Sequence, residues 1–91
     1  MTKIKEQENS ELDELTEQVY TVVVWNDSHN TFDYVIECLM RYCGHETQQA
    51  EQCTYLIHYK GKSDVKRGEK DKMQKIYNKL KSCGLTATIE E

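Results

Sequence analysis

The chain has 91 residues, of which 37% are hydrophobic and 31% are charged, and its formal net charge at pH 7 is −4. A chain of this length folds as one small domain with a modest core. It contains no apolar run long enough to span a membrane. Its first ten residues, MTKIKEQENS, lack the apolar segment of a secretory signal. We therefore expect a cytoplasmic protein that has no membrane partner.

The excess negative charge lies at the N-terminal end. Residues 1–19 hold two basic and six acidic side chains, whereas residues 20–91 hold ten of each. Residues 1–18 contain few large apolar side chains, so they cannot bury enough surface to offset the entropy lost on ordering. We expect a disordered acidic N-terminal extension over residues 1–18 and a folded core over residues 19–91.

The first half of the core predicts a strand followed by a helix. Residues 19–25, VYTVVVW, are rich in β-branched and aromatic side chains, and their continuous hydrophobicity is typical of a central, covered strand. After the polar residues 26–30, apolar side chains recur on one helical face up to residue 43. We expect this helix to begin at Asn30 or Thr31, with Asn30 as its N-cap and Asp33 closing a capping box. Gly44 should end it.

The second half predicts two more helices and two more strands. A second helix over residues 47–59 should end at Gly61, and a third helix over residues 69–82 should end at Gly84. Residues 63–67, SDVKR, form a weak strand candidate, and residues 85–90, LTATIE, alternate as in a half-exposed strand. The order β-α-α-β-α-β predicts an α+β fold, in which three helices pack on a small, mainly antiparallel three-stranded sheet.

The cysteines do not favour a metal site or catalysis. Nothing signals an oxidising compartment, so we expect free thiols packed as small apolar groups. Cys38 and Cys43 are five residues apart and no C-x-x-C pair occurs, which is not the spacing of a structural zinc site. No nucleophile motif or oxyanion-hole signature is present. We therefore expect no metal, no cofactor and no enzymatic activity.

Lysines concentrate in the third predicted helix. Residues 60–81 hold nine basic and three acidic side chains. This leaves open an alternative function, a small α+β protein-interaction or weak nucleic-acid-binding domain that uses this helix. Because residues 20–91 carry no net charge, phosphate affinity should be weak, and we expect no nucleic-acid partner.

The polar break NDSHN, residues 26–30, suggests a binding site for an ammonium group. A primary ammonium brings three hydrogen-bond donors and a positive charge. Asn26 and Asp27 offer an amide oxygen and a carboxylate. His58 can add a neutral imidazole nitrogen if the second helix packs against the first.

These segments resemble a known family. VVVWNDSHNTFDYVIECL (residues 22–39) and AEQCTYLIHYKGK (residues 50–62) are similar to ClpS, the adaptor protein of the ATP-dependent Clp protease. The family has a strand that ends in N-D-D and a second helix that ends in H-x-x-G, here Asn26–Asp27–Ser28 and His58–Tyr59–Lys60–Gly61. The closing LTATIEE, residues 85–91, resembles the family's terminal strand. From Ser63 to Glu69 the chain is shorter than the common pattern and lacks its C-G-V-F/Y-T strand.

The resemblance implies a monomeric adaptor for N-degrons, which are proteins that begin with Leu, Phe, Tyr or Trp. The adaptor would deliver them to an AAA+ unfoldase of the ClpA or ClpC type by docking on its N-terminal domain, and its acidic tail would engage the unfoldase channel. The residues that would hold the substrate's α-amino group are Asn26, Asp27, Ser28 and His58. Those that would form the hydrophobic pocket are Asn30, Phe32, Val35, Thr54, Ile57 and Leu85.

Two positions depart from the family's pattern. The family usually has Asp where this chain has Ser28, so one carboxylate is missing. It usually has Met where this chain has Thr54, and the smaller side chain should change which N-terminal residues fit.

Overall fold

A computed structural model describes residues 19–91, so the predicted acidic extension over residues 1–18 lies outside the described residues. The elements follow the order β1 (Val19–Trp25), α2 (Phe32–Cys43), α3 (Thr47–Lys60), β2 (Lys62–Glu69), α4 (Lys70–Ser82) and β3 (Thr86–Glu90). The predicted order β-α-α-β-α-β is confirmed, and the α+β fold with it.

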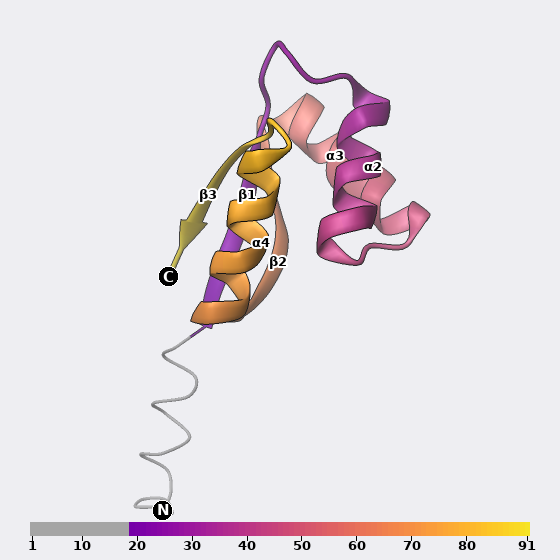
Figure 1. Cartoon of the computed structure of the whole chain (residues 1–91). Coiled ribbons are helices and arrows are strands. Elements are labelled where there is room, and N and C mark those ends of the chain that lie inside the picture. Colours follow the sequence, from indigo (N-terminus) through magenta and orange to yellow (C-terminus); the bar gives the residue numbers. More distant parts are fainter. Residues whose placement is uncertain (1–18) are drawn as a thin grey trace, which may run out of the picture.

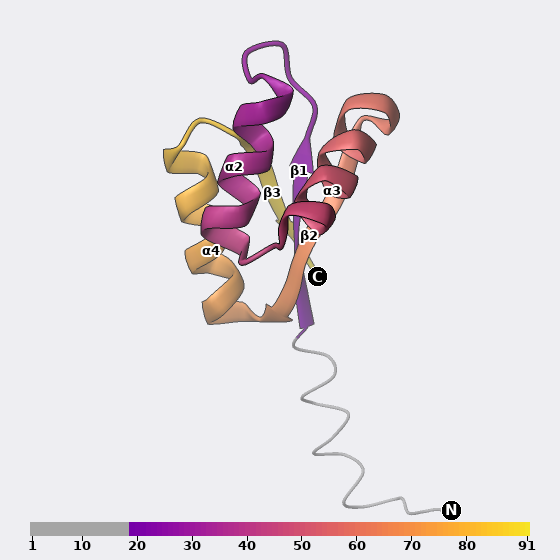
Figure 2. The same cartoon turned by 90° about the vertical axis from the view of Figure 1, so that its right-hand side faces the viewer.

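The three strands form one antiparallel sheet in the order β2-β1-β3. β1 is therefore the central strand, as its continuous hydrophobicity predicted. The pairing of β1 with β2 shifts register between Val22 and Val23, which marks a bulge. Figures 1 and 2 together show α2, α3 and α4 on one face of this sheet, with α2 between the other two helices.

The core lies between that face of the sheet and the three helices. Val22 and Val24 are 0% and 1% exposed and point to the helices, since successive side chains of a strand alternate between its faces. The helical stripes predicted from the sequence are largely buried against them. Phe32 and Met40 are exceptions, because 36% and 38% of their surfaces remain exposed at the edge of the α2 stripe.

The predicted start of the first helix is wrong by one residue. Thr31, not Asn30, is the N-cap, and its Oγ1 accepts from the backbone N–H of Tyr34 at 3.1 Å. A capping box on Thr31 would need its partner at Tyr34, so Asp33 does not close one. The reason is tertiary, because the Asn30 amide donates instead to Asp27 and to the Gly84 carbonyl.

β2, the second strand in sequence, is longer than predicted, whereas two helix ends follow the prediction. β2 spans Lys62–Glu69 rather than residues 63–67, because β1 supplies backbone partners along its whole length. Gly44 and Gly61 end α2 and α3 in left-handed conformations, with φ of 71° and 99°. Glycine adopts such angles at little cost because it has no Cβ.

Candidate functional site

A pocket opens where the C-terminal end of β1 meets the start of α2, the last turns of α3 and the start of β3. It encloses about 290 Å³, its open mouth included. Nine of the ten residues that the sequence and the resemblance singled out line it, namely Asn26, Asp27, Asn30, Phe32, Val35, Thr54, Ile57, His58 and Leu85. Ser28 is exposed and does not line the pocket.

The inner wall of the pocket is apolar. Val35, Ile57 and Leu85 are each less than 8% exposed and come from α2, α3 and the turn before β3. Thr54 is 2% exposed, and its hydroxyl donates to the Ala50 carbonyl at 2.7 Å. That bond turns the hydroxyl to its own helix and leaves the Thr54 methyl group to line the pocket.

Asp27 organises the loop that forms one side of the rim. Its Oδ1 accepts from the backbone N–H groups of His29 and Asn30 at 2.9 and 3.0 Å. Its Oδ2 accepts from the Asn30 amide and from the Thr86 hydroxyl, each at 2.9 Å. Desolvation by itself raises the pKa of the Asp27 carboxyl, but these hydrogen bonds outweigh it and hold the pKa below the ordinary value.

Asn30 connects this loop to the opposite side of the pocket. Its side-chain amide donates to both oxygens of Asp27 and, at 3.0 Å, to the carbonyl of Gly84. Gly84 directly precedes Leu85, which lines the pocket. The position of the pocket wall therefore depends on a hydrogen bond between residues 54 positions apart in sequence.

Asn26 and His58 are the acceptors at the rim that the fold leaves open. The backbone N–H of Asn26 donates to the Gly61 carbonyl at 2.9 Å, which ties the end of β1 to the end of α3. The exposed His58 ring stands edge-on to the Phe32 ring, with 5.9 Å between centroids. Neither side chain has a hydrogen-bond partner within residues 19–91. A pocket with an apolar wall and free acceptors at its rim suits a ligand that carries an ammonium group beside an apolar group.

Sequence reasoning missed four contributors to this site. Val24, Trp25 and Thr31 also line the pocket, and their position directly beside the polar break was a usable signal. Thr86 binds Asp27 across 59 residues of sequence, and no local pattern indicates that contact.

The described residues hold neither a metal-binding cluster nor a helix that could span a membrane. Within residues 19–91 no group of three or more His, Cys, Asp or Glu side chains is arranged to hold a metal ion. Over the same range, no helix has the length and apolar content to cross a membrane.

Comparison with known proteins identifies the family. The family model described as "ATP-dependent Clp protease adaptor protein ClpS" matches residues 16–88. The chain belongs to the ClpS family. The resemblance to ClpS that the sequence indicated is thereby confirmed. ClpS is a family of adaptors rather than of catalysts. ClpS adaptors partner with Clp protease unfoldases and with the substrates of those proteases.

Individual ClpS proteins are similar over most of their length. The ClpS of Rhodococcus jostii is 32% identical over 85 residues, which covers 93% of this chain and 76% of that protein. The ClpS of Thermosynechococcus vestitus is 37% identical over 68 residues, or 74% of this chain and 72% of that protein. The structure of Agrobacterium tumefaciens ClpS2 bound to L-phenylalaninamide superposes with a TM-score of 0.68 at 22% identity, covering 80% of this chain and 95% of that one. It shows that the two share the ClpS fold.

Proposed function

We propose that this ClpS-family chain binds N-degron substrates by their first residue, when that residue is Leu, Phe, Tyr or Trp. It then delivers them as a monomer, in the cytoplasm, to a Clp unfoldase of the ClpA or ClpC type by docking on the unfoldase's N-terminal domain. The observation that carries the proposal is the pocket at the end of β1, which joins an apolar wall to open acceptors at its rim.

The apolar wall of the pocket is where we place the substrate's first side chain. The substrate's first side chain would pack against Val35, Ile57 and Leu85. The related A. tumefaciens ClpS2 binds L-phenylalaninamide, which has a free α-amino group and a benzyl side chain. That pairing is the chemistry proposed here.

The residues at the rim would divide the recognition of the α-ammonium group. Asn26 and His58 would accept its hydrogen bonds, since their side chains are open to solvent. Asp27 already accepts several hydrogen bonds from the protein, so its main contributions would be its negative charge and the shape of the loop. We assign no contact to Ser28, which the structure leaves outside the pocket.

Titration of a fluorescent peptide that begins with Phe tests the proposal. The peptide with a free amine should bind, and its N-acetylated form should not, because acetylation removes the charge and two of the donors. Loss of one hydrogen bond to a charged group costs about 1.5–3 kcal/mol, so His58→Ala and Asn26→Ala should each weaken binding roughly 10- to 150-fold.

Lys75→Ala serves as the matched control. It removes an exposed side chain from α4, outside the pocket, and should leave affinity unchanged. Equal binding of the free and acetylated peptides would contradict the proposal. Binding that depended on Lys75 but not on His58 would favour the alternative function of the lysine-rich helix.

A further inference from the structure

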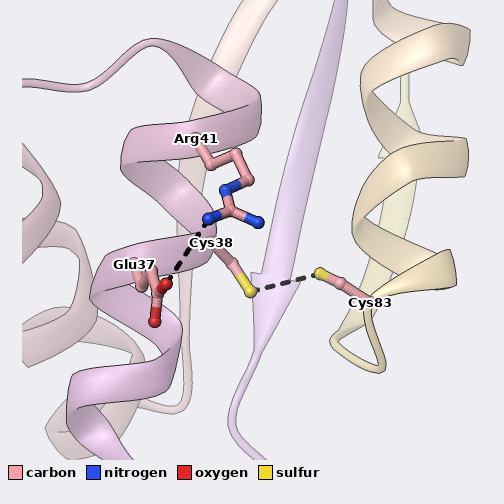
Figure 3. A network of polar contacts seen from close by, with 4 residues as sticks. All are labelled: Glu37, Cys38, Arg41 and Cys83. Atoms are coloured by element: carbon pink, nitrogen blue, oxygen red, sulfur yellow. Dashed lines mark hydrogen bonds and ion pairs between the residues drawn. The ribbon is translucent and has the colours of Figure 1, made fainter.

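Two cysteines far apart in sequence meet beside the pocket. The sulfurs of Cys38, in α2, and Cys83, at the C-cap of α4, lie 3.2 Å apart. Figure 3 shows both side chains pointing toward each other across the gap between the two elements. All four cysteines are free thiols in this structure. A disulfide bond is about 2.05 Å long, so the two sulfurs need to approach by only about 1.2 Å to form one.

The cysteine pair is accessible from the surface. A second pocket of about 230 Å³, also open at its mouth, lies over it and is lined by Tyr34, Glu37, Cys38, Arg41, Tyr42 and Cys83. Cys38 is 4% exposed, whereas Cys83 is only half-buried. Cys83 is therefore the more accessible residue of the pair.

The two thiols have different environments. Burial, followed by the hydrogen bond with Cys83, raises the pKa of the Cys38 thiol to about 11. Cys38 therefore stays protonated at neutral pH, which makes it a poor first nucleophile toward a peroxide. The Cys83 thiol lies 3.2 Å from the Leu80 carbonyl, to which it can donate.

We propose that Cys38 and Cys83 form a reversible disulfide in response to a peroxide. The Cys83 thiol loses its proton to water, and its sulfur attacks the peroxide. The O–O bond of hydrogen peroxide breaks, leaving a sulfenic acid on Cys83 and a hydroxide that becomes water. The Cys38 sulfur then attacks the Cys83 sulfur, the S–O bond breaks, and the departing hydroxide takes the Cys38 proton as a second water. Two electrons pass from the sulfurs to the peroxide.

The disulfide would hold one wall of the pocket of the candidate site in place. Cys83 begins the turn whose Gly84 carbonyl accepts from Asn30 and whose Leu85 lines that pocket. The Tyr34 hydroxyl, from α2, also donates to the Cys83 carbonyl. A covalent bond between α2 and this turn adds to these contacts and closes a loop across 45 residues. It restricts the unfolded chain and should stabilise the fold.

Peroxide treatment of the full chain, followed by alkylation of the remaining thiols, tests this inference without any peptide ligand. Intact mass should show the loss of two hydrogen atoms and the alkylation of two thiols. Digestion without reductant should yield a peptide that joins Cys38 to Cys83. The midpoint of thermal unfolding should rise by on the order of 10 °C. A dithiol reductant should reverse both changes.

Two cysteine variants make the assignment specific. Cys53→Ser removes a thiol outside the pair and should leave the disulfide and the rise in unfolding temperature intact. Cys83→Ser should abolish both. A wild-type chain that keeps four alkylatable thiols after peroxide would overturn the inference. So would a disulfide that maps to Cys43 and Cys53, or a Cys83 that proceeds to a sulfinic acid with Cys38 still reduced.

Discussion

At the scale of single residues, Thr54 is the position that should set specificity among N-terminal residues. The Met that is usual in the family at this place is longer than Thr54, and neither Met40 nor Tyr55 lines the pocket in its place. A β-branched substrate side chain carries an extra methyl group near the backbone, which a longer side chain at position 54 would crowd. A single methyl group is worth about 1–3 kcal/mol in such discrimination. We predict that peptides beginning with Ile or Val bind within about 10-fold of a Leu peptide.

Competition titrations with Leu, Ile and Val peptides check this prediction. Thr54→Met should weaken Ile and Val binding relative to Leu, because the longer side chain occupies the space beside Cβ. If the wild type and Thr54→Met reject Ile and Val equally, another lining residue such as Phe32 controls the entrance.

Asp27 should stabilise the fold in a pH-dependent way. Its pKa is lower in the folded chain than the ordinary value of 3.8, because its oxygens accept hydrogen bonds from the protein. The stabilisation is therefore fully present above pH 3.8 and is lost as pH falls through the lower, folded-state pKa. We predict that Asp27→Asn lowers the free energy of unfolding at pH 7 by on the order of 1 kcal/mol.

Urea unfolding of both proteins from pH 7 to acid measures that difference. The gap between wild type and Asp27→Asn should shrink as the carboxyl becomes protonated. Asp64→Asn, which alters an exposed carboxyl in β2, should show no such gap. A gap that stayed constant at every pH would assign the effect to shape rather than to the charge of Asp27.

At the scale of elements, Gly61 joins the end of α3 to the end of β1. Its N–H donates to the Ile57 carbonyl, and its carbonyl accepts from the Asn26 N–H. Its φ of 99° disfavours any residue that has a Cβ, although no atom would clash with that Cβ. Gly61→Ala should cost about 1–2 kcal/mol of stability. It should also weaken peptide binding, because the strain is relieved by moving the backbone that positions Asn26 and His58.

Gly44→Ala provides a matched comparison. Gly44 ends α2 with a φ of 71° and likewise has open space around its Cβ position, but its N–H donates to the carbonyl of Leu39, which does not line the pocket. Its substitution should cost similar stability, measured by urea unfolding, and leave peptide affinity unchanged. Equal losses of affinity in both variants would show that binding follows overall stability and not the α3–β1 junction.

At the scale of the whole molecule, substrate binding and substrate delivery should depend on different parts of the chain. The residues that line the pocket all lie between Val24 and Leu85, so a chain shortened to begin at Val19 should bind a Phe peptide normally. The resemblance to the family implies that the acidic residues 1–18 act on the unfoldase. The shortened chain should therefore fail to support degradation of a Phe-initiated reporter by a purified Clp protease. Full degradation would contradict the role proposed for residues 1–18.

The sequence by itself determined the order of the elements, the central place of β1 and the family. These features depend on local patterns, such as the continuous apolar run around Val23 and the spacing of apolar residues along each helix. The sequence also determined most of the candidate site, because Asn26 and His58 occupy recognisable positions of a family motif.

Only the tertiary structure decided how the site is held together. Asn30 serves the pocket instead of capping α2, because Asp27 and Gly84 accept from its amide. The contact between Cys38 and Cys83 likewise joins residues 45 positions apart. Such contacts leave no periodic signal in the sequence, because packing the helices on the sheet brings together residues whose separation along the chain is arbitrary.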